Sequence, residues 1–132
     1  MILINYIKKV LKIIRYNKFY KIKSETNGML GYELYRTFYN IAKKNSNANF
    51  LEIGGAHGAV SISLALGLKK KQGKGKIIVF EKCEKGSRSK YGDYNQNYQI
   101  LIENLNKFNV RDNIHLIPKL LDKSTFLEAK KY

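Results

Sequence analysis

The spacing of hydrophobic residues changes several times along the chain, and each change predicts a new secondary-structure element. Near the N-terminus, apolar residues recur every three or four positions opposite a polar face rich in lysine. This spacing is typical of an amphipathic helix. Its apolar face consists of Leu3, Ile4, Ile7, Val10, Leu11 and Ile14, and its polar face of Asn5, Lys8, Lys9, Lys12 and Arg15.

The segment 23–28, KSETNG, interrupts this pattern, and a second helical pattern follows it. This second helix ends at Lys43 and Lys44, two cations suited to a helix C-terminus, before the loop sequence NSNAN. Its expected buried face consists of Leu30, Leu34, Phe38, Ile41 and Ala42.

Three short apolar runs, at 50–53, 77–80 and 114–117, predict β-strands. We expect the first run to be a buried strand, because it is too short and too apolar for a surface helix. Helical patterns separate the strands. Their apolar positions are Val60, Leu64, Ala65 and Leu68 in the first, and Tyr98, Leu101, Ile102, Leu105 and Phe108 in the second.

This alternation of strands and helices predicts an α/β fold. Strands joined by helical crossovers form a parallel sheet with right-handed connections, as in half of a Rossmann-like, doubly wound fold. The chain has 132 residues, which is enough for one domain with a single core. We therefore predict a basic helix and linker at 1–27, and a partial Rossmann-like domain of about three strands at 28–132.

The formal charge of +15 indicates an anionic partner such as nucleic acid or a membrane surface, unless it reflects an AT-rich coding sequence. Seven of the 25 basic residues lie in the first 23 positions, where there is no acid. Two roles stay open for this leader helix: packing on the domain or a partner, and contact with a membrane surface. The single cysteine favours a reducing, cytoplasmic location, and no apolar run approaches the roughly 20 residues that span a bilayer.

A glycine-rich turn at 54–58 and an acid after the second strand, Glu81, form the candidate site. Ligands of doubly wound sheets bind outside the carboxyl ends of the strands, where both features are expected. Glycines permit close backbone approach, amides at a helix start favour anions, and a carboxylate accepts hydrogen bonds from ribose hydroxyls. The pattern thus favours a nucleoside with an anionic tail. The alternative is a tight turn under a packed helix beside a solvated acid.

Two common nucleotide sites do not match this turn. A dinucleotide fingerprint needs glycine at three places, and here the second and third are Ala56 and Ala59. A phosphate-binding P-loop needs Gly-Lys-Ser/Thr at the helix start, whereas Gly58 precedes Ala59 and Val60. NAD, FAD and nucleoside triphosphates are therefore disfavoured.

The remaining pattern, E-x-G-x-x-x-G over Glu52, Gly54 and Gly58, resembles motif I of the class I S-adenosylmethionine-dependent methyltransferases. IIVFE and NLNKFNVRDNIHLIP are similar to the segments that follow in this family, so the resemblance covers about 28–121. It implies S-adenosylmethionine as the cofactor. Glu52 and the backbone of Gly54, Gly55, Ala56 and Gly58 would hold its methionyl part, Glu81 its ribose, and Lys82 and Cys83 would lie beside adenine.

The resemblance gives no cofactor-binding role to two further polar residues, His57 and Asp122. We expect His57, in the variable middle of the loop, to face solvent rather than to act in catalysis. Asp122 lies several places later than the residue that contacts adenine in the family, so that contact is in doubt.

The resemblance also implies that the chain is a truncated, N-terminal half. Acceptor-binding groups of the family follow its fourth strand, so no catalytic residue is assigned, and no metal site is expected. A small-molecule or glycan acceptor would be methylated only once a second chain or the missing half completes the sheet at the free, apolar edge of the first strand. The spacing of Thr125 and Glu128 predicts that a further helix begins there.

The alternative function is a basic, non-enzymatic binding module for nucleic acid or an acidic membrane surface. Nucleic acid is the less favoured partner, because stacking needs exposed aromatic rings. Tyr35, Tyr39 and Tyr98 instead fall at apolar helix positions, where we expect core packing.

Overall fold

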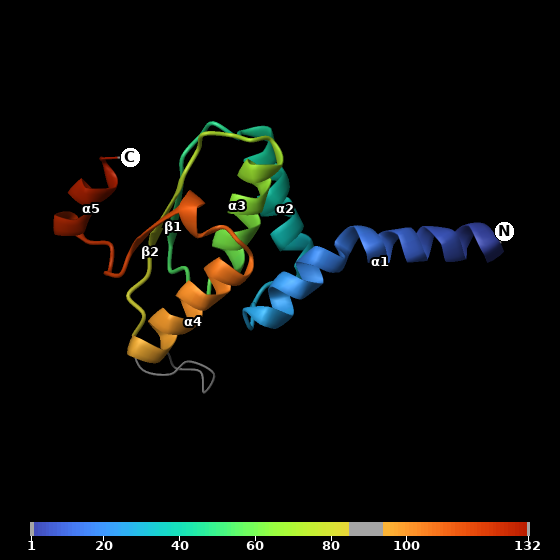
Figure 1. Cartoon of the computed structure of the whole chain (residues 1–132), viewed down its shortest axis with the longest axis horizontal. Helices are drawn as coiled ribbons and strands as arrows, with labels where there is room; N and C mark the ends of the chain where they lie inside the picture. Colours follow the sequence, from blue (N-terminus) through green and yellow to red (C-terminus); the bar gives the residue numbers. More distant parts are fainter. Residues whose placement is uncertain (1, 85–93, 132) are drawn as a thin grey trace.

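The computed structural model describes residues 2–84 and 94–131, and the element order predicted from the sequence is confirmed (Figure 1). Helices precede and separate three short strands. The elements are α1 (Ile2–Glu25), α2 (Tyr32–Lys44), β1 (Phe50–Ile53), α3 (Ala59–Lys70), β2 (Ile77–Phe80), α4 (Tyr94–Lys107), the short 3-10 helix η1 (Arg111–Asn113), β3 (Ile114–Ile117) and α5 (Lys123–Ala129).

The three described strands form one parallel sheet in the order β1-β2-β3. Phe50 pairs with Ile77 and Ile77 with Ile114, so all three strands end at the same edge. Hydrogen bonds continue past the strands, because the Gly54 amide donates to the Phe80 carbonyl (2.7 Å) and the Glu81 amide to the Ile117 carbonyl (3.1 Å). The predicted Rossmann-like, parallel α/β arrangement is confirmed, and it brings the glycine turn and Glu81 to neighbouring strand ends.

The main core lies between the helices and one face of the sheet. Ile77 and Val79 of β2 point into it, together with buried residues of α3 and α4. The predicted buried face of α2 is confirmed in part: Ala42 is buried and Phe38 packs half-buried against the core, whereas Leu30, Leu34 and Ile41 are exposed. Tyr35 and Tyr39, for which core packing was predicted, are buried in their place. Tyrosine rings bury a large apolar area when the hydroxyl finds a partner, and the Tyr35 hydroxyl accepts a hydrogen bond from the Leu30 amide (3.0 Å).

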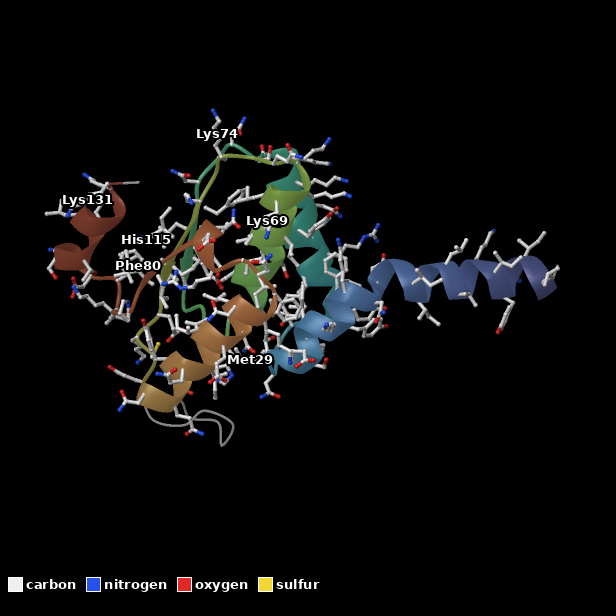
Figure 2. All side chains as sticks on the ribbon, in the orientation of Figure 1. Met29, Lys69, Lys74, Phe80, His115 and Lys131 are labelled. Atoms are coloured by element: carbon white, nitrogen blue, oxygen red, sulfur yellow. The ribbon has the colours of Figure 1, made fainter. Side chains whose placement is uncertain are left out.

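The opposite face of the sheet is covered over β2 and β3 but not over β1. Ile78, Phe80 and Ile117 form a second buried cluster there, against Leu121; Figure 2 labels Phe80. On β1, Leu51 and Ile53 are exposed, so the prediction of a fully buried strand was wrong for this face. The reason is positional: β1 is the edge strand of the described sheet, and no described element covers its outer face.

Helix α1 has two halves with different surroundings. Its C-terminal half packs on the domain, because Phe19 and Ile22 are buried in the main core and the Tyr16 ring meets Tyr32 edge to face at 5.4 Å. Its N-terminal half extends away from the rest of the molecule (Figure 1). The prediction of packing on the domain thus holds for the second half of α1 alone.

Asp122 caps the N-terminus of α5. Its carboxylate accepts hydrogen bonds from the Ser124 hydroxyl (2.6 Å) and from the amides of Thr125 (2.9 Å) and Ser124 (2.8 Å), and these bonds lower the pKa of Asp122 to about 2. The helix therefore begins at Lys123, earlier than the spacing of Thr125 and Glu128 predicted. The helix begins before Thr125 because the Asp122 carboxylate already accepts hydrogen bonds from the amides of Ser124 and Thr125.

Candidate functional site

The turn between β1 and α3 has the conformation that its glycines allow. Gly54 and Gly58 have φ angles of 82° and 94°, and Ala56 also lies in the left-handed region at 46°. A side chain on Gly58 would approach Leu101 to 3.0 Å, and one on Gly55 would meet Val79 at 2.6 Å. A side chain on Gly54 would meet nothing within 4 Å. The turn is thus packed tightly against the domain on one side and open at Gly54.

Glu81 binds this turn directly. Its Oε2 accepts a hydrogen bond from the Ala56 amide at 2.5 Å, and its Oε1 accepts one from the Cys83 amide at 2.7 Å. The acid that follows β2 and the turn that follows β1 therefore share one rim of the sheet. Hydrogen bonding to two amides orients the carboxylate and leaves further lone pairs on each oxygen for a ligand.

A cavity of about 170 Å³ lies at this rim. Lys82 also lies on its wall, with its ammonium paired to the Glu84 carboxylate at 2.9 Å. The volume is below the roughly 300–1,000 Å³ of typical small-molecule sites, so this cavity has room for only part of a ligand of nucleoside size. The lining residues are Ala56, His57, Glu81, Lys82, Cys83, Glu84 and Asn97.

Glu52 lies on β1, beneath the turn, rather than on the cavity wall. The Ser61 hydroxyl, one turn into α3, donates a hydrogen bond to its carboxylate. Burial raises the pKa of Glu52 to about 7, and the charge of Glu81 adds to this while the Ser61 bond opposes it. Near neutral pH this carboxyl is therefore poised between its two protonation states.

Cys83 is a structural residue of the rim. The side chain is buried, and burial raises the pKa of its thiol to about 11, with the Glu81 charge as the second cause. A thiol with this pKa stays protonated at neutral pH, and thiolate is the reactive form. Its positive φ of 56° turns the backbone so that its amide reaches Glu81.

The expectation that His57 faces solvent was wrong, because its side chain is only 3% exposed. Two asparagines of α4 hold this residue. Its Nε2 lies 3.2 Å from Oδ1 of Asn97, and its carbonyl accepts a hydrogen bond from Nδ2 of Asn104 at 2.9 Å. The turn bends toward α4 at this residue, so the ring packs beneath the rim instead of leaving it.

Several solved structures share this fold. The O-methyltransferase from Bacillus cereus in complex with SAH matches with a TM-score of 0.58 and 16% identity, covering 89% of this chain and 48% of that one. A putative O-methyltransferase from Klebsiella pneumoniae gives 0.56 and 14%, covering 86% and 46%. The O-methyltransferase TomG from Streptomyces achromogenes, involved in tomaymycin synthesis and in complex with SAM, gives 0.53 and 15%, covering 86% and 45%.

Over the part that it spans, the chain has the Rossmann-like fold of these methyltransferase structures. No protein-family model and no curated protein sequence matches the chain. The chain spans slightly less than half the length of the methyltransferase structures that it resembles.

Within this methyltransferase fold, the residues expected at the cofactor site fall into two groups. The turn, Glu81 and Lys82 meet at the rim, whereas Glu52 lies behind the turn and touches Ser61. Three turn amides, those of Gly54, Ala56 and Gly58, already donate to protein oxygens. Three turn carbonyls, those of Gly55, His57 and Gly58, likewise accept hydrogen bonds within the protein. The side of the turn that is open to a ligand is therefore at Gly54.

Sequence reasoning missed one residue of the rim, Asn97. Its side-chain amide donates to the carbonyls of Cys83 and Glu84, both at 3.2 Å, and so fixes the segment that follows β2. The residue sits on α4, at least 13 positions from these partners. No hydrophobic period or motif marks it, because its role comes only from how α4 lies against the end of β2.

Proposed function

We propose that this chain is the S-adenosylmethionine-binding part of a class I methyltransferase. The observation that carries the proposal is the contact of Glu81 with the Ala56 amide, which joins the glycine turn and the strand-end acid at one cavity. The solved methyltransferases with the same fold support it. The acceptor that we propose is a small molecule, which includes a sugar or glycan hydroxyl, and the location is the cytoplasm.

The residues of the rim fit an adenosyl group chemically. Glu81 has acceptor capacity for the paired ribose hydroxyls, and Lys82 and Cys83 form the wall on which adenine would lie. The open face of Gly54 leaves space for the methionyl part, whose ammonium group suits the carbonyl oxygens of the turn. Glu52, behind the turn, adds a partial negative charge on the same side near neutral pH, because its pKa is about 7.

The bound cofactor supplies a methyl group that its sulfonium has already activated. The contribution of this chain is to bind and orient that group, so that an acceptor oxygen can approach in line. Glu81 positions the ribose, and the packed side of the turn holds the loop rigid through Gly55 and Gly58. We assign no general base among the described residues.

A further strand is proposed to complete the sheet along β1. Within the described residues this strand pairs with β2 alone, and Leu51 and Ile53 are exposed on its outer face. Parallel sheets normally have both faces covered. Either a second chain or another half of a longer protein could supply that strand together with the acceptor-binding groups.

Glu81→Gln is expected to weaken binding of S-adenosylhomocysteine by about tenfold to a hundredfold. The amide keeps the shape of the side chain, but it loses the charge that strengthens hydrogen bonds from ribose hydroxyls and from the amides of Ala56 and Cys83. Isothermal titration calorimetry of the full chain gives the dissociation constants. Glu103→Gln, an exposed acid of α4, is the matched control and should bind like the unchanged chain.

Two results would contradict the proposed function. One is an absence of saturable binding of S-adenosylhomocysteine or S-adenosylmethionine by the unchanged, folded chain. The other is equal affinity of the Glu81→Gln and unchanged chains, which would place the ligand away from this rim. Circular dichroism of both variants verifies that the fold is retained.

A further inference from the structure

The N-terminal half of α1, residues 2–15, presents an apolar surface that the domain does not cover. Leu3 and Leu11 are 68% and 58% exposed, and Ile7 and Ile14 between and beyond them are exposed as well. Figures 1 and 2 show this half of the helix extending from the molecule with no other element beside it. Large exposed apolar surfaces of this kind mark interaction sites.

The apolar and basic residues of this segment lie on separate sides of the helix. At 3.6 residues per turn, the apolar residues named above fall within an arc of roughly 200° when Ile2, Tyr6 and Ile13 are included, and this arc is centred near Leu3 and Ile14. Asn5, Lys8 and the further cations of the segment occupy the remaining arc. No acid precedes Glu25, so the polar side is uniformly positive. The segment is therefore a cationic amphipathic helix.

The apolar side faces away from the domain. In the second half of α1 the core contacts come from Phe19 and Ile22. At helical spacing Phe19 lies on the side that carries Asn5 and Lys8 in the first half, and Ile22 lies in line with Ile4, at the margin of the apolar side. The buried side of the helix is thus rotated toward the basic side from Tyr16 on. A straight helix that buries Phe19 and Ile22 in the domain cannot also turn the apolar side of residues 2–15 toward it. That apolar side therefore needs a different surface.

We propose that residues 2–15 of α1 lie in the interface of an acidic lipid bilayer. The apolar side enters the boundary between headgroups and acyl chains, and the lysines flank it at the level of the anionic headgroups. Because the domain is attached on the basic side of the helix, it stays on the aqueous side of the membrane. None of the helices among the described residues is long and apolar enough to cross a bilayer, so the contact is peripheral.

Charge favours this surface over a second copy of the chain. Two α1 helices paired through their apolar sides would leave both basic sides facing outward, with no acid in residues 2–15 to pair with their cations. An anionic headgroup layer has the opposite sign and attracts each nearby cation by about fivefold in partitioning. The apolar arc of roughly 200° is also wider than the narrow seam of a helix pair.

The test measures how the full chain partitions onto lipid vesicles. We expect co-sedimentation with vesicles of phosphatidylcholine and phosphatidylglycerol, weaker association with pure phosphatidylcholine, and a decrease at high salt. Leu3→Asn combined with Leu11→Asn should lower partitioning by about tenfold or more. Leu120→Asn with Leu127→Asn, which removes two leucines that are 61% and 63% exposed elsewhere, should change it by less than about twofold.

Three outcomes would overturn the proposal. The first is that the unchanged chain does not bind acidic vesicles, or binds them no better than neutral ones. The second is that both leucine pairs lower partitioning equally. The third is a concentration-dependent dimer in analytical ultracentrifugation that the Leu3/Leu11 variant abolishes, which would assign the stripe to a second copy. Circular dichroism verifies that each variant stays helical, and none of these results depends on cofactor binding at Glu81.

Discussion

Glu52→Gln is expected to raise the free energy of unfolding by about 2 to 3 kcal/mol at pH 8. The carboxyl lies beneath the glycine turn, where burial and the nearby charge of Glu81 raise its pKa from 4.5 to about 7. Ionising it in the folded state is therefore costly. Glutamine has the same shape, can accept the hydrogen bond from Ser61, and carries no charge.

The pH dependence of this effect has a definite sign. The folded state holds the Glu52 proton up to a pKa of about 7, whereas the unfolded chain releases it near 4.5. The stabilising contribution of this proton is complete below pH 4.5 and is lost as the pH rises to about 7, by roughly 1.4 kcal/mol per pH unit. Above that range the loss is constant.

Urea unfolding of both chains from pH 4.5, where the loss begins, to about pH 8, where it is complete, measures this difference. Subtracting the curve of the unchanged chain from that of Glu52→Gln removes the contributions of the other acids. Glu103→Gln, at an exposed position of α4, should give a difference near zero at every pH. A Glu52→Gln difference that stays flat across the range would mean that Glu52 titrates normally in the folded protein.

Gly67→Val is expected to lower the free energy of unfolding by about 3 kcal/mol. Gly67 lies on α3 where this helix crosses α2 closely. A side chain there would come within 2.3 Å of the Tyr39 carbonyl oxygen and 2.9 Å of the Ala42 side chain. A backbone oxygen cannot rotate aside, so the two helices would have to separate and expose part of the main core.

Urea unfolding followed by circular dichroism gives the change for Gly67→Val. Lys70→Val places the same β-branched side chain on an exposed position of the same helix and should change stability by at most about 0.5 kcal/mol. If valine at Gly67 were as well tolerated as at Lys70, the close approach of α2 and α3 would be absent in solution. If Gly67→Val does not fold, the unfolding free energy of Gly67→Ala is measured instead, because alanine adds only the Cβ atom that meets the Tyr39 carbonyl oxygen.

The elements and their order followed from the sequence because each has its own local signal. Runs such as IIVF at 77–80 are too short for a buried helix and too apolar for a loop, and alternation with helical spacing left a parallel sheet as the simple arrangement. The prediction that Tyr35 and Tyr39 belong to the core was also confirmed. Tyr35 and Tyr39 are four residues apart, so they lie on the same face of the helix, and this spacing indicated their burial.

Two details differed from the prediction, each because it depends on whether a distant segment covers the residue. His57 is buried by Asn97 and Asn104 of α4, at least 40 positions away. Leu51 and Ile53 are exposed because no described element covers the outer face of β1. Hydrophobic spacing reports how apolar a position is, but not which neighbour reaches it.

The sequence by itself determined the order of elements, the parallel sheet, and the placing of a glycine turn and Glu81 after neighbouring strands, since all of these follow from local periodicity and strand polarity. Only the tertiary structure decided that the Glu81 carboxylate accepts a hydrogen bond from the Ala56 amide and that the half-buried Glu52 lies beneath the turn. It also decided that the apolar side of residues 2–15 is left exposed by the domain. These depend on register, burial and the rotation of one helix against its neighbours, which are set by contacts between residues far apart in the chain.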